Sequence, residues 1–259
     1  MSRRHIAFDC EGAQLIGTLD EGSATTALLI VTGGNEVRAG AWNGQAQFAA
    51  RIAGAGFPVL RFDRRGVGDS GGVNSGFSDS AADIAAALAA LRAASPLVTR
   101  VIGMGNCDGA TALVLAKGAG CDGLVLSNPW TIEGDEGDQP APAPPAAVRA
   151  HYLRRLRDPK AILRFLGGGV KIGQLFGSLK SALHPAPQPS TLAQTFAAEL
   201  KAYRGPVTIL LASRDRTAQV FEACWDKSDP RVRRCAEATH SYVESQGWLE
   251  SQVLEALRA

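Results

Sequence analysis

The chain lacks a strong charge of either sign, a disulfide-like cysteine pattern and any long apolar run. Its 259 residues carry a formal net charge of +2, whereas a dedicated nucleic-acid-binding protein normally has a clear basic excess. No stretch reaches the roughly 18 apolar residues of a membrane span, and the amino-terminal segment lacks the apolar core of a signal peptide. We therefore expect no nucleic-acid partner, no membrane span and a cytoplasmic location.

Cysteine is scarce as well. The five cysteines are widely spaced, odd in number and contain no CxxC pair, so neither a disulfide framework nor a metal site is predicted, and no cofactor motif is present. Hydrophobic residues make up 46% of the chain, which is enough for a sizeable core. The length suits one α/β domain of about 250 residues that carries an insertion.

Short apolar runs alternate with longer helical patterns along the chain. Residues 1–20 predict a hairpin. We expect strands at 27–31, 57–62, 98–104, 123–127, 207–211 and, more weakly, 233–237, with helices at about 42–53, 78–94 and 110–117. Strands that alternate with helices imply right-handed crossovers and therefore a doubly wound, mostly parallel sheet.

The segment 131–204 interrupts this alternation. It opens with an acidic loop and a proline cluster at 140–145, continues with two or three helical stretches, and closes with prolines at 185–189. Proline clusters around a helical block between two core strands predict an inserted cap. The predicted organisation is a core of residues 1–130 and 205–259 with a helical cap at 131–204.

Residues 149–171 of the expected cap are basic and amphipathic. Seven arginines and lysines lie there beside a single acid, Asp158, and apolar side chains are interleaved with them. One interpretation is a solvated helix face whose apolar side covers the active site. The other is contact with an anionic partner, such as a membrane surface, a phosphate-bearing carrier or an acidic acyl group.

The sharpest chemical motif is GNCDG at 105–109. It directly follows the expected strand 98–104 and precedes the expected helix 110–117. This is the G-x-nucleophile-x-G pattern of a nucleophile elbow, with cysteine where serine is more usual. Small flanking residues let strand and helix approach, and the helix start favours the thiolate form. The motif predicts Cys107 as the nucleophile. The other cysteines are interpreted as packing or surface residues: Cys10, Cys121, Cys224 and Cys235.

An elbow of this kind predicts an acid and then a histidine later in the chain. Asp215 follows the strand 207–211, at the carboxyl end where catalytic groups of open α/β sheets gather. Asp226 and Asp229 are nearby alternatives, but neither follows a strand. The acid is therefore predicted to be Asp215.

His240 is the predicted base because it follows the weak strand 233–237. His5 precedes the elbow and so cannot be the third member, while His151 and His184 lie inside the expected cap.

Backbone N–H groups must stabilise the charge that develops on the substrate oxygen. One donor is expected at Asp108, directly after the nucleophile, and others at Gly34 and Asn35, in the loop that follows strand 27–31.

The segment DRRGVGDS at 63–70 lacks the Gly-Lys-Ser/Thr ending of a phosphate loop. It is interpreted as a structural bend beside the elbow.

These segments together resemble the α/β-hydrolase superfamily. The resemblance is closer to the hydrolase family associated with the exosortase A system, and it spans nearly the whole chain. It rests on LLIVTGGNEVRAG, VLRFDRRGVGDS, GNCDGA, GLVLSNPW, AHYLRRLRDPKAILRFLGGGVKIGQLFGSL and LLASRDRTA. That family accompanies exopolysaccharide and sorting-signal gene clusters in Gram-negative bacteria. The resemblance implies an α/β-hydrolase fold, a cysteine nucleophile at Cys107, and Asp215 and His240 as its partners.

The motifs favour a cysteine-dependent hydrolase that cleaves an ester, a thioester or a lactone of a small-molecule acyl substrate through an acyl-enzyme. Two alternatives stay open. An acyltransferase would use the same acyl-enzyme, because thioesters react readily with amines and alcohols. A non-catalytic accessory protein of exopolysaccharide or protein-sorting systems would carry the site as a relic.

Overall fold

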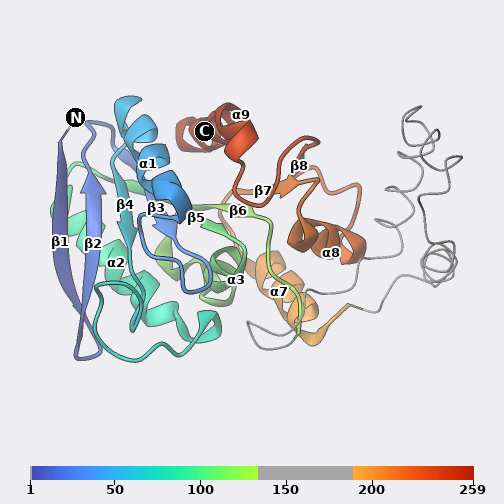
Figure 1. The fold of residues 1–259 in the computed structure, drawn as a ribbon, viewed down its shortest axis with the longest axis horizontal. Helices are drawn as coiled ribbons and strands as arrows, with labels where there is room; N and C mark the ends of the chain where they lie inside the picture. The colour runs from blue at the N-terminus through green and yellow to red at the C-terminus, as the bar shows by residue number, and fades with distance from the viewer. Residues whose placement is uncertain (1, 134–188) are drawn as a thin grey trace, which may run out of the picture.

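The computed structural model describes residues 2–133 and 189–259. In these ranges the strands form one sheet with the order β1-β2-β4-β3-β5-β6-β7-β8 (Figure 1). The strands are β1 (Arg3–Cys10), β2 (Ala13–Asp20), β3 (Thr26–Val31), β4 (Val59–Phe62), β5 (Arg100–Asn106), β6 (Gly123–Ser127), β7 (Val207–Ala212) and β8 (Val232–Cys235). The strands from β4 to β8 pair in parallel, and the β1–β2 hairpin joins β4 antiparallel. The expected α/β fold with a mostly parallel sheet is confirmed.

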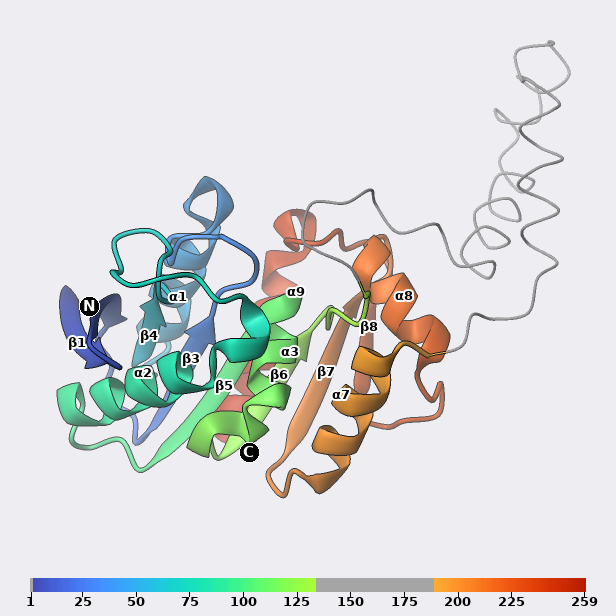
Figure 2. The same cartoon turned by 90° about the horizontal axis from the view of Figure 1, so that it is seen from below.

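Helices cover both faces of the sheet (Figures 1 and 2). On one face lie α1 (Gly44–Gly54) and α9 (Gln246–Arg258); on the other lie α2 (Ala81–Ala94), α3 (Asp108–Leu115), α7 (Thr191–Ala202) and α8 (Arg216–Cys224). Short 3₁₀ turns are η1 (Ala41–Asn43), η2 (Phe77–Asp79), η3 (Lys117–Gly120) and η4 (Val243–Ser245). In the described part of the chain, no helix is long and apolar enough to cross a membrane.

Strand β3 shows why the central strands are continuous apolar runs. Alternate side chains of a strand point to opposite faces of the sheet. Ala27, Leu29 and Val31 pack with the core beneath α2 and α3, whereas Leu28 and Ile30 pack beneath α1 and α9. Because both faces of the strand are buried, its sequence is apolar throughout and does not alternate between apolar and polar residues.

Helix α7 belongs to the core, although the sequence analysis assigned its residues to the cap. Phe196 and Leu200 on one face of the helix are buried in the main apolar cluster. The Phe196 ring packs edge-on against Phe221 of α8 and against Trp225, with ring centroids 5.6 and 5.8 Å apart. Residues 134–188 lie outside the described residues, so the helical cap and its basic stretch at 149–171 stay predictions.

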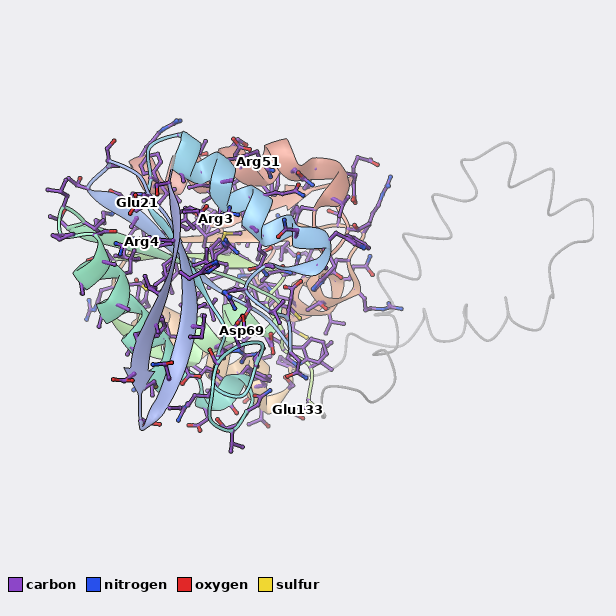
Figure 3. The ribbon with its side chains drawn as sticks, turned by 60° about the vertical axis from the view of Figure 1, so that its left-hand side comes forward. Arg3, Arg4, Glu21, Arg51, Asp69 and Glu133 are labelled. Carbon is purple, nitrogen blue, oxygen red and sulfur yellow. The ribbon has the colours of Figure 1, made fainter. Side chains whose placement is uncertain are left out.

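A buried ion pair fixes the β1–β2 hairpin to the sheet. Asp20, at the end of β2, is fully buried and accepts hydrogen bonds from Arg61 of β4 at 3.2 Å and from Arg3 at 2.6 Å. The Arg61 side chain is 2% exposed. Beside this pair, Arg4 and Glu21 form an exposed ion pair at 2.9 Å, and Figure 3 shows them with Arg3 at one end of the hairpin.

Replacement of Asp20 by alanine is expected to cost about 3–5 kcal/mol of unfolding free energy, because it leaves the Arg61 guanidinium buried without a carboxylate. The neighbouring Glu21→Ala variant loses only a solvent-exposed pair and should cost about 0–1 kcal/mol. Urea unfolding of both variants, followed by circular dichroism, measures the difference. Equal losses would show that the buried pair contributes no more than the surface pair.

Candidate active site

Cys107 lies on a sharp turn between β5 and α3. Its backbone has φ 58° and ψ −128°, in a region that non-glycine residues rarely adopt. A Cβ atom on Gly105 would lie 2.4 Å from the backbone of Gly109, and one on Gly109 would lie 2.5 Å from the carbonyl oxygen of Val31. The glycines on both sides of the thiol are therefore required by the close approach of strand, helix and neighbouring loop.

The loop after β3 lies directly against this turn. A Cβ atom on Gly33 would lie 2.6 Å from both the Asn106 carbonyl oxygen and the Asp108 carboxylate. The N–H of Gly34 donates a hydrogen bond to Oδ1 of Asp108. This corrects the expectation that Gly34 offers its N–H to a substrate oxygen, because that N–H already binds a carboxylate. The backbone amides of Asn35 and Asp108 stay as predicted donors.

Arg64 connects the DRRGVGDS segment to the same loop. Its guanidinium donates hydrogen bonds to the carbonyl oxygen of Gly34 and to Ser80 Oγ, and it lies 3.7 Å from the Asp108 carboxylate. Arg64 and Asp108 are both buried. The segment therefore packs beside the elbow as a structural bend, as the sequence analysis interpreted it.

Asp215 and His240 meet at the carboxyl end of β7 and β8. Oδ1 of Asp215 lies 3.1 Å from Nδ1 of His240. The other carboxylate oxygen, Oδ2, accepts a hydrogen bond from the backbone N–H of Ala218 at 3.0 Å and caps helix α8. The carboxylate of Asp215 thus caps the amino end of α8 and also orients the imidazole of His240. The capping hydrogen bond holds the carboxylate in place.

The imidazole of His240 also lies close enough to the Cys107 side chain for the two groups to influence each other. Burial alone lowers the pKa of His240, but its pairing with Asp215 and the nearby Cys107 side chain outweigh this effect and raise the pKa to about 10. Protonation of the imidazole is therefore favoured when the thiol has lost its proton. The structure thus pairs His240 with Asp215 and places Cys107 near the imidazole.

The other candidate acids, and the histidine of the hairpin, make contacts away from Cys107 and His240. Asp229 pairs with Arg231 at 2.8 Å and accepts a hydrogen bond from the Trp225 indole, while Asp226 is exposed and binds Ser228. His5 contacts Thr18 of the hairpin. His151 and His184 lie outside the described residues.

Two asparagines that the sequence analysis did not assign hold the histidine loop against the elbow. Nδ2 of Asn128 donates hydrogen bonds to Oδ1 of Asn106 at 3.0 Å and to the carbonyl oxygen of His240 at 3.2 Å. This fixes the orientation of the Asn106 amide, whose nitrogen lies 3.3 Å from Nε2 of His240. Nε2 is therefore the ring atom that faces the elbow.

Asn128 also joins neighbouring strands. Its Oδ1 accepts hydrogen bonds from the backbone N–H of Ala212 at 2.8 Å and from the Tyr242 hydroxyl at 3.3 Å. Asn128 is completely buried and has φ 43°, a left-handed conformation that asparagine tolerates better than most residues. A polar residue directly after the buried strand β6 was the sequence signal that could have identified it.

A cysteine on a sharp turn after β5, with a histidine and an acid in loops that follow later strands of a mostly parallel sheet, is the arrangement typical of the α/β-hydrolase class. The sequence profile of the alpha/beta hydrolase family matches residues 28–250. The chain therefore belongs to the alpha/beta hydrolase family.

Three solved structures with the same fold are similar to the chain at low sequence identity. The esterase Pf2001 of Pyrococcus furiosus is 18% identical, with a TM-score of 0.60 over 99% of this chain and 90% of that chain. The thioesterase domain from the curacin biosynthetic pathway is 14% identical, with a TM-score of 0.56 over 98% and 100%. XC6422 of Xanthomonas campestris, described as an α/β serine hydrolase without a lid, is 14% identical, with a TM-score of 0.59 over 100% and 94%. A search of curated proteins finds no match.

Replacement of Asp215 by asparagine is expected to lower the pKa of His240, because the negative charge that favours the imidazolium is lost. Asparagine is also a good helix cap, so α8 should stay intact. An NMR titration of the His240 ring proton measures the change. The control is Asp226→Asn, which removes an exposed carboxylate that does not contact His240. Equal titration curves for wild type and Asp215→Asn would contradict the pairing.

Proposed function

We propose that the protein is a cysteine-dependent hydrolase of an ester, a thioester or a lactone. The observation that carries this proposal is the position of Cys107: its thiol lies on the elbow at the start of α3, close to His240, and His240 pairs with Asp215 at 3.1 Å. A nucleophile, a base and an orienting acid in this order are the groups that acyl transfer to the enzyme needs.

The proposed reaction begins when His240 takes the thiol proton of Cys107. The thiolate sulfur attacks the carbonyl carbon and forms a C–S bond, and the backbone N–H groups of Asn35 and Asp108 stabilise the negative oxygen. The intermediate collapses when the bond to the leaving group breaks and His240 gives its proton to that group. Water, deprotonated by His240, then attacks the thioester, and the acid and the free thiol are released.

The electrostatics of the site support the first step. The raised pKa of His240 means that the imidazole holds a proton well when it faces a thiolate. Cys107 is also at the amino end of α3, where the helix dipole favours a negative charge. Both features support attack by the cysteine sulfur with His240 as its proton acceptor.

The substrate class comes from family resemblance and from neighbours in fold. The neighbours described as esterases and a thioesterase support an acyl ester or thioester. The closer resemblance to exosortase A system-associated hydrolases supports the cysteine chemistry and a role beside exopolysaccharide or protein-sorting systems, and both are part of the proposal.

Labelling of the intact protein with a thiol-reactive acyl probe tests the function directly. Wild type should form an acyl-enzyme, detected by mass spectrometry, and Cys107→Ala should not. Product analysis with and without an amine or alcohol acceptor then separates hydrolysis from acyl transfer. A wild-type protein that is not acylated by any probe would favour the non-catalytic alternative.

Cys107 should be the first of the five thiols to react with iodoacetamide at neutral pH. Burial and the Asp83 carboxylate raise the pKa of Cys10 to about 11, and burial raises the pKa of Cys121 to about 12. Burial also raises the pKa of Cys224. Because the thiolate is the reactive form, these three thiols are disfavoured. Peptide mapping after short reaction times measures the order, and faster modification of Cys121 or Cys224 would contradict the assignment.

A Cys107→Ser variant is expected to lose most of the ester-cleaving activity, with a lower kcat and little change in KM. Serine keeps the position of the nucleophile, but an alcohol gives up its proton far less readily than a thiol. Steady-state kinetics on one ester and its thioester measure the loss. A serine variant as active as wild type would show that the site is not adapted to sulfur.

A further inference from the structure

A cavity of about 300 Å³ lies between α1 and α9, next to the proposed active site. Asn106 and His240 line it together with Met104 of β5, and Ile30 and Val31 line it at the carboxyl end of β3. The cavity therefore reaches the predicted base and the residue that precedes Cys107.

The cavity extends along helix α1. Its lining includes Gly44, Phe48 and Arg51 on α1, and Leu249 on α9. A rise of 1.5 Å per residue makes the stretch from Gly44 to Arg51 about 10 Å long. At about 30 Å³ per heavy atom, the share of a water molecule in the liquid, the volume accommodates about ten non-hydrogen atoms. An elongated group of that size fits it.

Besides His240, the charged residues of this lining are already engaged within the described structure. Glu36 accepts hydrogen bonds from the backbone N–H of Ala41 and from Gln45 Nε2, each at 2.6 Å. Arg51, labelled on α1 in Figure 3, pairs with Glu250 of α9 at 2.8 Å. A charged ligand would have to break one of these pairs, whereas an uncharged ligand leaves both intact.

Apolar side chains are exposed in this lining. The Trp42 side chain is 81% exposed and Val243 is 50% exposed. Trp42 is also held at φ 51°, a strained conformation for an aromatic residue. Large exposed apolar side chains next to a cavity are typical of ligand-binding sites.

We propose that this cavity, named here the α1–α9 pocket, binds the uncharged alkyl group of the substrate, a chain of about eight to ten carbons. The inference rests on the proposed function for its chemistry. It specifies which esters the proposed enzyme prefers, namely those with a medium-length alkyl chain. Each methylene that enters the pocket should tighten binding about fourfold.

Gly44 offers a way to fill the pocket without disturbing the fold. It has helical φ and ψ of −63° and −44°, and a Cβ atom added there would meet nothing within 4 Å. A Gly44→Leu side chain would therefore occupy pocket volume. The matched control is Gly54→Leu, because Gly54 lies on the same helix, is exposed and also has open space, but does not line the pocket.

Hydrolysis of two ester series tests the pocket. One series is methyl alkanoates and the other is alkyl acetates, each from two to twelve carbons in the varied chain. In wild type, kcat/KM should rise with chain length up to about eight to ten carbons in one series, and that series shows whether the acyl or the alcohol side enters the pocket. Gly44→Leu should lower the ratio of the eight-carbon to the two-carbon value at least tenfold, whereas Gly54→Leu should leave the ratio unchanged.

Binding to the Cys107→Ala variant tests the pocket without catalysis. Titration calorimetry with acetamide, hexanamide and octanamide should show tighter binding of the longer amides, and the added Gly44→Leu change should remove that gain. If no ester is cleaved but octanamide binds in this Gly44-dependent way, the proposed chemistry is wrong and the pocket stands. If esters of all lengths are cleaved equally and octanamide binds no better than acetamide, the pocket is wrong and the chemistry stands.

Discussion

Close backbone packing around Cys107 is the constraint on which the rest of the site depends. Strand β5, helix α3 and the loop after β3 approach so closely that Gly33, Gly105 and Gly109 have no room for a side chain. Cys107 itself takes a positive φ, which costs of the order of 1–3 kcal/mol for such a residue. That cost is offset by the packing that surrounds the turn, so the position of the half-buried Cys107 follows from the burial of its neighbours.

Two buried charged side chains next to this turn bind the same loop residue and also lie close to each other. Asp108 binds the Gly34 amide, Arg64 binds the Gly34 carbonyl oxygen, and Arg64 and Asp108 lie within ion-pair distance of each other. Two opposite charges can be buried here because each also satisfies backbone groups of the same loop. The pair thereby fixes the loop after β3 relative to Cys107. It uses the backbone N–H of Gly34, which we had expected to face the substrate.

The sequence was sufficient for those parts of the site that follow from local patterns. The small residues around Cys107 and the positions of Asp215 and His240 after strands could be predicted, because the carboxyl ends of parallel strands meet at one edge of the sheet. The use of the Gly34 N–H by Asp108 could not be predicted, since it depends on the exact approach of two loops 74 residues apart. Likewise, α7 follows a long insertion, and only its contact with Phe221 and Trp225 reveals that it covers the sheet.

Asn128 ties the loop that carries His240 to the sheet and so limits local opening of the site. Loops that carry catalytic groups commonly open by local fluctuation at a small free-energy cost. Here the backbone of His240 is bound by a completely buried amide that also binds Ala212 of β7 and the side chain of Asn106. Separation of the imidazole from the thiol would expose these groups and disturb the sheet itself. Amide hydrogens of the histidine loop should then exchange together with those of the sheet, so that the integrity of the site and the integrity of the fold are a single cooperative property.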